Sequence, residues 1–320
     1  RKETSTNMNS ARPTPVFLPS VVDGLPAVIG RSPFVTLTVI PAWGAKIASL
    51  RAADGHEWLW RNPHLPWRLP TVATSYIREA DVGGWDECFP AVGPGPYPLP
   101  PWQGRPIRDH GEVWAQAWEV EEAADCLRLA TTGDQFPYRL VRTIRLAAAE
   151  PAFEMTYELT NLSPAPFAFL WCAHPLLAIT PGMHLRLPPG SPVRSDGHLP
   201  GRFTWPAAGA LDLTHVPGPE AAWAAKLYVG PLTEGWAALY DPATGRELRF
   251  EFDVRVTPFV GLWLNYGGWS GAGSAPYYNL GLEPCSGMPD DLASAVDPAW
   301  NAFSTVAAHS TLTWRLRVHV

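Results

Sequence analysis

Proline and glycine occur along the whole length of this chain, and their frequency constrains the fold more than any other feature. The 320 residues include 36 Pro and 27 Gly, and neither type favours the interior of a long helix. The charged share is only 17% and the hydrophobic share is 46%, so the chain as a whole is not disordered. We therefore expect many short strands joined by turns.

Strict alternation of apolar and polar side chains indicates several strands with one buried face. Residues 153–160 follow this two-residue period, and residues 141–146, 248–252 and 312–320 repeat it. Such a pattern is typical of antiparallel sheets that place one face in the core.

Turn and helix signals complete the prediction. Residues 241–245 have the chemistry of a tight turn and predict a hairpin, and only residues 290–295 indicate a short helix. The proline-rich residues 94–106 are expected to form a long ordered loop, and loops of that length are usually functional. The fold class predicted is all-β: one large antiparallel β-sandwich domain over residues 16–320, after a disordered tail over residues 1–15.

The charge balance excludes some partners. The net charge is −6 and only three lysines occur, Lys2, Lys46 and Lys226, with no basic cluster. A nucleic acid or an anionic membrane is therefore not expected as a partner. No apolar run reaches the roughly 18 residues of a membrane span, and the polar N-terminus lacks the apolar core of a signal peptide.

The cysteines point to a reducing compartment. Cys88, Cys126, Cys172 and Cys285 are scattered and form no Cys-x-x-Cys pair, which excludes a zinc ribbon or a thioredoxin motif. A chain of this size does not need disulfides, so reduced thiols and a cytoplasmic location are expected.

Tryptophan is the most over-represented residue type. The chain has 16 Trp among its Trp, Tyr and Phe residues. These rings serve core packing, or they stack on the apolar faces of sugars in a carbohydrate-binding protein.

Two segments in the first third of the chain concentrate reactive groups. Residues 83–90 place Asp86 and Glu87 side by side among Gly, Trp and Phe. Neighbouring strand residues point to opposite faces, so at most one of the two carboxylates enters a given site. The alternative is a surface turn. His110 precedes a strand expected over residues 113–118, either facing a cavity or in a structural role.

Two later segments end apolar runs with a single ionisable residue followed by proline. His174 follows a run that begins at residue 167, and Pro175 is expected to end that strand because proline cannot continue the ladder. Glu283 follows a stretch of apolar, aromatic and small residues and precedes Pro284. A carboxylate there costs desolvation energy unless it is paired or functional.

An imidazole and a partly buried carboxylate are the pair needed to exchange protons near neutral pH. We therefore expect His174 and Glu283 to converge on one pocket, with His110, Arg78 and an aromatic wall from Trp263 or Trp85. The motifs of a serine nucleophile, a phosphate loop, a dinucleotide fold, a zinc protease and a calcium loop are all absent.

Two of these segments closely resemble the galactose mutarotase-like proteins, or aldose 1-epimerases. Residues 282–290, Leu-Glu-Pro-Cys-Ser-Gly-Met-Pro-Asp, resemble the strand that carries the catalytic Glu of that family. Residues 171–175, Trp-Cys-Ala-His-Pro, resemble its catalytic His strand, including the Asn-Leu-Ser turn at residues 161–163.

Further motifs occur in the family order. His110 with its following Gly resembles a substrate-binding His, and residues 76–78 lie where the family places a sugar-binding Arg. Residues 259–265 resemble the strand before the catalytic Glu. The likeness extends from about residue 35 to the C-terminal strand.

The resemblance implies a galactose mutarotase-like sandwich that interconverts the α and β anomers of an aldose without a metal or a cofactor. By this likeness Glu283 takes the proton of the C1 hydroxyl and His174 protonates the ring oxygen. Arg78 and His110 hold hydroxyls or the ring oxygen. The expected partner is a small sugar, and the protein is expected to be a monomer or a homodimer.

The sequence departs from the better-known members at two points. Ala and Pro flank His174 where those members have Asn and Ser or Thr, and their additional sugar-binding Asp has no clear counterpart. The candidates for that Asp are Asp212, Asp241 and Asp253, none in a matching context, while Asp86 or Glu87 could replace it.

Three other functions stay open at this point. A non-catalytic sugar-binding protein on the same fold would use Glu283 only as a hydrogen-bond acceptor. A metal enzyme would use His174, Glu283, Cys172 and Cys285, although none of these has the spacing of metal ligands. A glycoside hydrolase or lyase would use two carboxylates such as Asp86 and Glu283.

Overall fold

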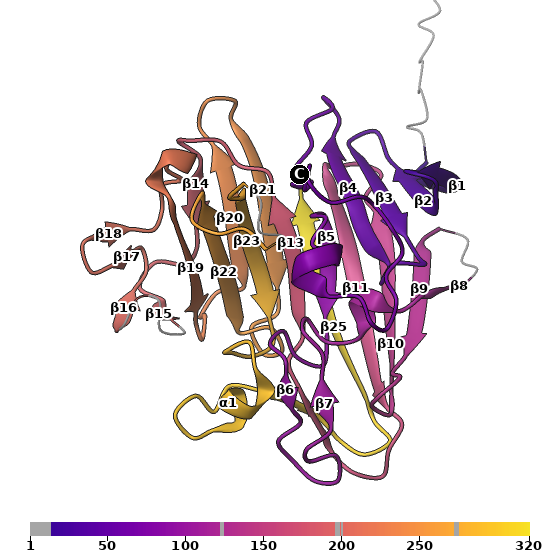
Figure 1. The fold of residues 1–320 in the computed structure, drawn as a ribbon. Helices are drawn as coiled ribbons and strands as arrows, with labels where there is room; N and C mark the ends of the chain where they lie inside the picture. The colour runs from indigo at the N-terminus through magenta and orange to yellow at the C-terminus, as the bar shows by residue number, and fades with distance from the viewer. Residues whose placement is uncertain (1–13, 122–124, 196–198, 200, 272–274) are drawn as a thin grey trace, which may run out of the picture.

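The computed structural model describes residues 14–121, 125–195, 199, 201–271 and 275–320. The disordered tail expected over residues 1–15 lies almost wholly outside these ranges. The described chain forms two large antiparallel sheets that pack face to face (Figure 1). The all-β sandwich expected from the sequence is therefore confirmed.

The larger sheet has thirteen strands. In spatial order they are β1 (Val16–Val22), β2 (Leu25–Arg31), β3 (Val35–Ile40), β4 (Lys46–Ala52), β5 (Trp85–Cys88), β13 (Cys172–Leu177), β23 (Tyr278–Cys285), β22 (Phe259–Tyr266), β19 (Trp223–Val229), β15 (Pro192–Ser195), β16 (Arg202–Thr204), β17 (Ala207–Ala208) and β18 (Leu211–Asp212).

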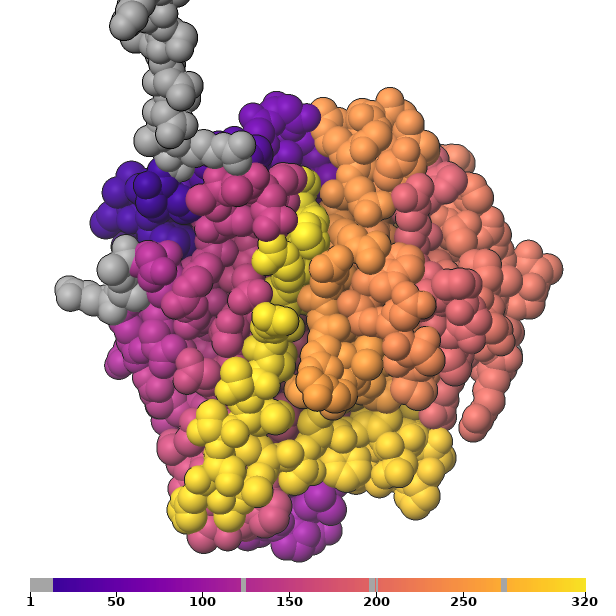
Figure 2. All heavy atoms as spheres, turned by 180° about the vertical axis from the view of Figure 1, so that it is seen from behind, coloured from indigo at the N-terminus to yellow at the C-terminus, as the bar shows by residue number. Residues whose placement is uncertain are grey.

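The smaller sheet has eight strands, and in Figure 2 its strand β25 crosses the back of the molecule between earlier strands of the chain. In spatial order the strands are β14 (His184–Arg186), β20 (Trp236–Asp241), β21 (Arg246–Phe252), β25 (Thr311–His319), β11 (Ala152–Asn161), β10 (Tyr138–Leu146), β9 (Leu127–Thr132) and β8 (Glu119–Glu121).

Short elements connect and cover the sheets. Two small two-stranded antiparallel sheets pair β6 (Gly95–Pro96) with β7 (Pro106–Ile107) and β12 (Phe167–Phe169) with β24 (Ser304–Val306). The helical elements are η1, a π-helical turn (Tyr76–Ala80), the 3-10 turns η2 (Val113–Ala115) and η3 (Pro219–Ala221), and α1 (Leu292–Val296). Among the described residues, no helix is long and apolar enough to cross a bilayer.

Most of the strands expected from alternation are present. The expected strands at 141–146, 153–160, 248–252 and 312–320 correspond to β10, β11, β21 and β25. The turn at 241–245 joins β20 to β21, and the short helix expected near residue 290 is α1.

One expected strand is wrong. Residues 113–118 begin with the 3-10 turn η2, in which Val113 and Trp114 are both buried. A half-buried strand cannot bury two consecutive side chains on one face, so alternation fails here.

The face between the sheets is the core, and aromatic rings and one ion pair join its two sides. Trp85 of β5 packs against Phe153 of β11 and Phe250 of β21, at ring-centre distances of 6.5 and 5.5 Å. Glu87 of β5 accepts a hydrogen bond from Arg142 of β10 at 2.9 Å, and both side chains are fully buried. Residues 85 and 87 of β5 therefore face the core, and residues 86 and 88 face the other side of the larger sheet.

Prolines open the ladder between β13 and β23. The paired positions Cys172 with Cys285 and Leu176 with Gly281 continue one register, but no pairing is formed between them. In that register His174 lies opposite Glu283. The gap in the ladder is therefore centred on the two residues singled out in the sequence.

The expectation that Pro175 ends its strand is wrong, and the reason is the side on which the missing N–H falls. Leu176 donates its N–H toward β5, so the nitrogen of Pro175 faces β23. Ser286 donates its N–H to the segment before β13, so the nitrogen of Pro284 faces β13. Both missing donors fall in the open part of the ladder, and each strand continues through its proline.

Candidate active site

A pocket of about 330 Å³ opens on the larger sheet, on the face that points away from the smaller sheet. Its floor includes His174 of β13, Lys226 of β19 and Trp263 of β22, and its rim includes His110 and Asp290. Strands that are distant in sequence thus supply the floor, and loops supply the rim.

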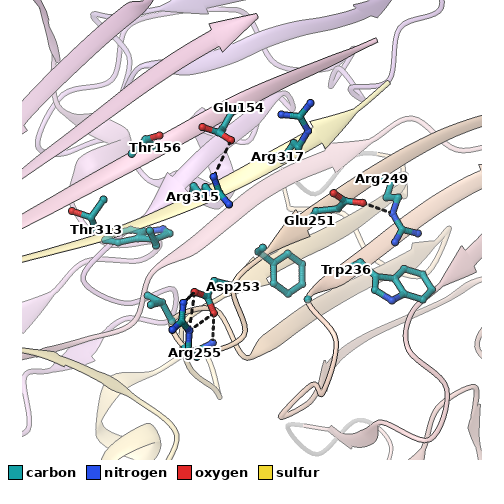
Figure 3. Close-up of a pocket in the computed structure, with 14 residues that line it drawn as sticks. Glu154, Thr156, Trp236, Arg249, Glu251, Asp253, Arg255, Thr313, Arg315 and Arg317 are labelled. Atoms are coloured by element: carbon teal, nitrogen blue, oxygen red, sulfur yellow. Dashed lines mark hydrogen bonds and ion pairs between the residues drawn. The ribbon is translucent and has the colours of Figure 1, made fainter. Parts of the chain in front are cut away.

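A wider groove of about 850 Å³ lies over the outer face of the smaller sheet (Figure 3). Its charged side chains pair with one another, as Arg255 does with Asp253 at 2.6 Å and Arg249 with Glu251 at 3.0 Å. No histidine lines this groove. The pocket on the larger sheet is therefore the better candidate for proton-transfer chemistry.

His174 lines the pocket, and Glu283 lies directly behind it without lining the pocket itself. His174 Nε2 lies 3.6 Å from Glu283 Oε1, and the side chains are 7% and 0% exposed. His174 Nδ1 and Glu283 Oε1 have no hydrogen-bond partner. Two buried polar atoms without partners at one pocket indicate groups that are satisfied by a ligand.

The pKa of His174 lies well below its ordinary value. Burial is the main cause, because it removes water from the charged imidazolium, and the nearby His110 and Lys226 add repulsion. His174 is therefore neutral near pH 7 in the free protein.

His110 covers the pocket from a strained turn. Its backbone has a φ of 60° and that of Gly111 has 74°. Its ring stacks on that of Tyr76 at a centre distance of 3.7 Å and lies edge-on to that of His174 at 5.1 Å. Asp109 lies 2.9 Å from His110 Nδ1 and fixes the ring further.

Asp86 sits beside His174 on the pocket face, as the register of β5 and β13 pairs these two residues. One of its oxygens accepts hydrogen bonds from Lys46 at 2.6 Å and from the Tyr76 hydroxyl at 2.8 Å, and the other has no partner. Asp86 is almost fully buried and therefore supports the floor.

Four of the expected sugar-binding residues, the supporting Asp86 among them, do not line the pocket. Trp85 and Glu87 lie on the core face of β5, where the two-residue period of a strand places them. Arg78 is exposed on η1 and does not line the pocket. Tyr76 and Ile77 of the same turn do line it. His110 and Trp263 do line it.

Sequence reasoning missed the buried cations and some of the acids. Lys226 donates to Glu283 Oε2 at 2.5 Å and lies 3.5 Å from Asp290, and Lys46 pairs with Asp86. A lone lysine inside an apolar strand was the available signal, as in the sequence Trp-Ala-Ala-Lys-Leu-Tyr-Val of β19.

A further missed acid is Asp81, at the end of η1. It lines the pocket, one of its carboxylate oxygens has no partner, and burial raises its pKa to about 7. No sequence pattern distinguished it from the other acids of this loop.

The cysteines give no evidence of a metal centre. Cys88, Cys172 and Cys285 lie in register across β5, β13 and β23, and all are free thiols. Burial raises the pKa of the Cys172 thiol well above its ordinary value. Within the described ranges, no group of three His, Cys, Asp or Glu side chains has a metal-binding arrangement.

Comparisons with solved structures match nearly the whole chain. The Slr1438 protein of Synechocystis sp. PCC 6803 is 18% identical with a TM-score of 0.65, over 98% of each chain. A galactose mutarotase related enzyme of Lactobacillus acidophilus is 14% identical with a TM-score of 0.66, over 95% of this chain and 97% of that one. A galactose mutarotase-like protein of Lactobacillus casei is 18% identical with a TM-score of 0.64, over 92% and 99%.

At these identities the likeness shows the fold, which is that of galactose mutarotase-like proteins. The fold implied by the sequence motifs is thus confirmed. No protein-family model and no curated protein sequence matches the chain.

Proposed function

We propose that this protein is an aldose 1-epimerase, which interconverts the α and β anomers of an aldose. The observation that carries the proposal is the approach of His174, which lines the pocket, to 3.6 Å from the buried Glu283 behind it, each with an unpartnered buried atom. Such a pair can remove one proton from a sugar and deliver another.

The reaction needs two proton transfers. Glu283 takes the proton of the C1 hydroxyl, the bond between C1 and the ring oxygen breaks, and its electron pair stays on that oxygen. His174 in its protonated form gives a proton to the ring oxygen. Rotation of the open-chain aldehyde about the C1–C2 bond and closure in reverse order produce the other anomer. Since Glu283 has no exposed surface in the free protein, we expect the sugar to widen the gap between the two side chains.

The walls suit a neutral monosaccharide. Trp263 and Trp269 line one side with their rings at a right angle, and such rings pack well on the apolar face of a sugar. Asp109 and Asp290 add acidic groups at the rim. Burial opposes ionisation of Asp109, but the hydrogen bond with His110 outweighs it and lowers the pKa of this carboxyl. Burial raises the pKa of Asp290, so the ionised Asp109 is the rim group that disfavours a phosphorylated sugar.

The test is anomer exchange with purified protein. Polarimetry on freshly dissolved α-glucose and α-galactose, and NMR exchange for other aldoses and aldose phosphates, measures the catalysed rate. Glu283→Gln keeps the size of the side chain but removes proton acceptance, so the rate is expected to fall by about 10²–10⁴-fold.

Glu251→Gln is the matched control, because Glu251 lies on the outer face of the smaller sheet and pairs with Arg249. It is expected to keep the wild-type rate. If the wild-type protein accelerates exchange of no aldose, the epimerase proposal is wrong, and calorimetry with the same sugars then tests the non-catalytic sugar-binding alternative.

A further inference from the structure

Three neighbouring strands of the larger sheet build a buried ion pair that reaches the floor of the pocket. Lys226 of β19 extends across β22 to Glu283 of β23, and its Nζ lies 2.5 Å from Oε2 of that carboxylate. The two side chains are 8% and 0% exposed. A buried pair at this distance is a short, charge-assisted hydrogen bond.

The strand between Lys226 and Glu283 has no side chain at the point where the two meet. Gly261 of β22 lies directly opposite Glu283, and a Cβ atom there would be 2.7 Å from Glu283 Oε2 and 3.4 Å from Lys226 Nζ. Gly261 has no left-handed backbone that would itself require glycine. Its missing side chain therefore makes room for the contact between the ammonium and the carboxylate.

The contact distinguishes the two oxygens of Glu283. Oε2 accepts from Lys226, whereas Oε1 has no partner and faces His174 Nε2. Only Oε1 is thus left to accept a proton from a ligand.

The ammonium also keeps its own charge. Burial opposes the charged form of Lys226, but Asp290 and Glu283 outweigh burial and raise its pKa well above the ordinary value. Lys226 therefore carries its positive charge near neutral pH.

We propose that Lys226 is a positioning residue for the acid/base pair: it holds Glu283 through Oε2 and thereby directs Oε1 alone toward His174 and a bound sugar. This inference rests on the proposed epimerase function and deepens it. Nothing in the sequence motifs of the fold assigns a role to Lys226.

Other charged and titratable groups surround the pair, and their contribution must be separated from that of Lys226. Those that lie near His174, Glu283 or Lys226 are Lys46, Tyr76, Asp86, Cys88, Asp109, His110, Cys172, Tyr228, Cys285 and Asp290. None of them changes in the variants below, so a difference between variants reports on the contact of Lys226 with its neighbours.

The first experiment titrates the histidine. NMR follows the His174 ring signal against pH in wild type and in Lys226→Met, and the signal is assigned by its loss in His174→Gln. Removing the repelling ammonium is expected to raise the pKa of His174. Arg249→Met removes a cation on the far face of the smaller sheet and is expected to leave the titration unchanged.

The second experiment measures kinetics. In Lys226→Met, kcat is expected to fall by at least about tenfold, the scale of a lost charge-assisted hydrogen bond, with a smaller change in KM. The limb of the pH profile that reports on His174 is expected to move to higher pH, because the imidazolium loses a positive neighbour.

Gly261→Ala breaks the contact while Lys226 remains. It is expected to lower kcat as well, and the double variant is expected to be no slower than Lys226→Met, because both changes remove one interaction. Multiplying losses in the double variant would overturn the inference. If Lys226→Met fails to fold, Gly261→Ala alone decides, and an unchanged kcat and pH profile in that variant overturns it.

The experiments distinguish a failure of the proposed epimerase function from a failure of the positioning role of Lys226. A wild-type protein without anomer exchange removes the epimerase function, while the NMR titration still tests the charge of Lys226 on His174. An unchanged His174 titration in folded Lys226→Met removes the positioning role even in an active enzyme.

Discussion

His174 shows how one residue acquires its chemistry from its surroundings. Its position in a strand gives it a fixed direction, and burial next to His110 and Lys226 keeps its imidazole neutral in the free protein. In the proposed reaction this neutral imidazole must gain a proton before it acts as the acid, so that reaction requires sugar binding or a lower pH to favour the charged form.

The lowered pKa of His174 predicts how the stability of the protein depends on pH. The unfolded chain protonates this histidine below about pH 6.5, while the folded protein does so only at lower pH. Between these values the unfolded state binds more protons, so the free energy of unfolding falls as the pH drops. Urea unfolding of wild type and His174→Gln at about pH 7.5 and about pH 5.5 checks this. A smaller fall is expected in the variant, and equal falls would contradict the assignment.

At the scale of an element, the turn that carries His110 depends on one glycine. Gly111 has a φ of 74°, and a Cβ there would lie 2.0 Å from the carbonyl oxygen of Phe89. That oxygen belongs to the backbone and cannot rotate away. The turn therefore depends on glycine for its space as well as for its backbone angle.

Gly245 is a matched position for testing this dependence, since its φ is 75° but nothing lies within 4 Å of a Cβ. Gly245→Ala is expected to cost only the left-handed strain of about 1–2 kcal/mol. Gly111→Ala is expected to cost more, because the clash adds to the strain, and to slow catalysis by displacing His110. Chemical denaturation and anomer exchange on both variants provide the measurement, and equal losses of stability would contradict the steric argument.

The elements also show what the sequence could predict. Alternation predicted β10, β11 and β25 because each has one face in the core. It could not predict that β13 and β23 continue through their prolines, because a proline is equally compatible with a strand end and with an open ladder. That difference depends on the neighbouring strand, which is more than a hundred residues distant in sequence for β13 and β23.

Some residues of the candidate site were predictable from the sequence, and others were not. His174 and Glu283 were identified by their abrupt ending of apolar runs, and His110 by the family motif. Lys226 was missed because its role depends on the contact with Glu283, which lies 57 residues later in the sequence. Arg78 was expected at the site only from the family resemblance, and the structure places it exposed on the π-helical turn η1.

At the scale of the whole molecule, the sheets are held in register by a polar contact as well as by aromatic packing. Glu87 of the larger sheet accepts hydrogen bonds from Arg142 and Tyr157 of the smaller one, at 2.9 and 2.8 Å, and from Trp171 at 2.8 Å. This contact lies directly behind the strand that carries Asp86. Burial raises the pKa of Glu87, and Arg142 acts against that rise.

Breaking this pair on one side is expected to be costly. Arg142→Met leaves the Glu87 carboxylate buried without its cation, which typically costs about 3–5 kcal/mol. Adding Glu87→Gln is expected to restore part of the loss because it removes the unpaired charge. Arg186→Met, at a half-exposed pair with Glu247, is the control and is expected to cost at most about 1 kcal/mol. Urea unfolding measures all three, and a double variant less stable than Arg142→Met would contradict this account.

Strands carry the proposed acid/base pair, whereas loops carry the charged residues at the rim of the pocket. The proposed acid/base pair and Lys226 stand on strands of the larger sheet, where neighbouring strands lie about 4.8 Å apart. Asp109, His110 and Asp290 stand on connections that can change length and sequence without disturbing those strands. Under the proposed function, exchanging these loops is therefore expected to change which sugar is accepted while the acid/base pair is kept, and grafting them offers a route to engineered specificity.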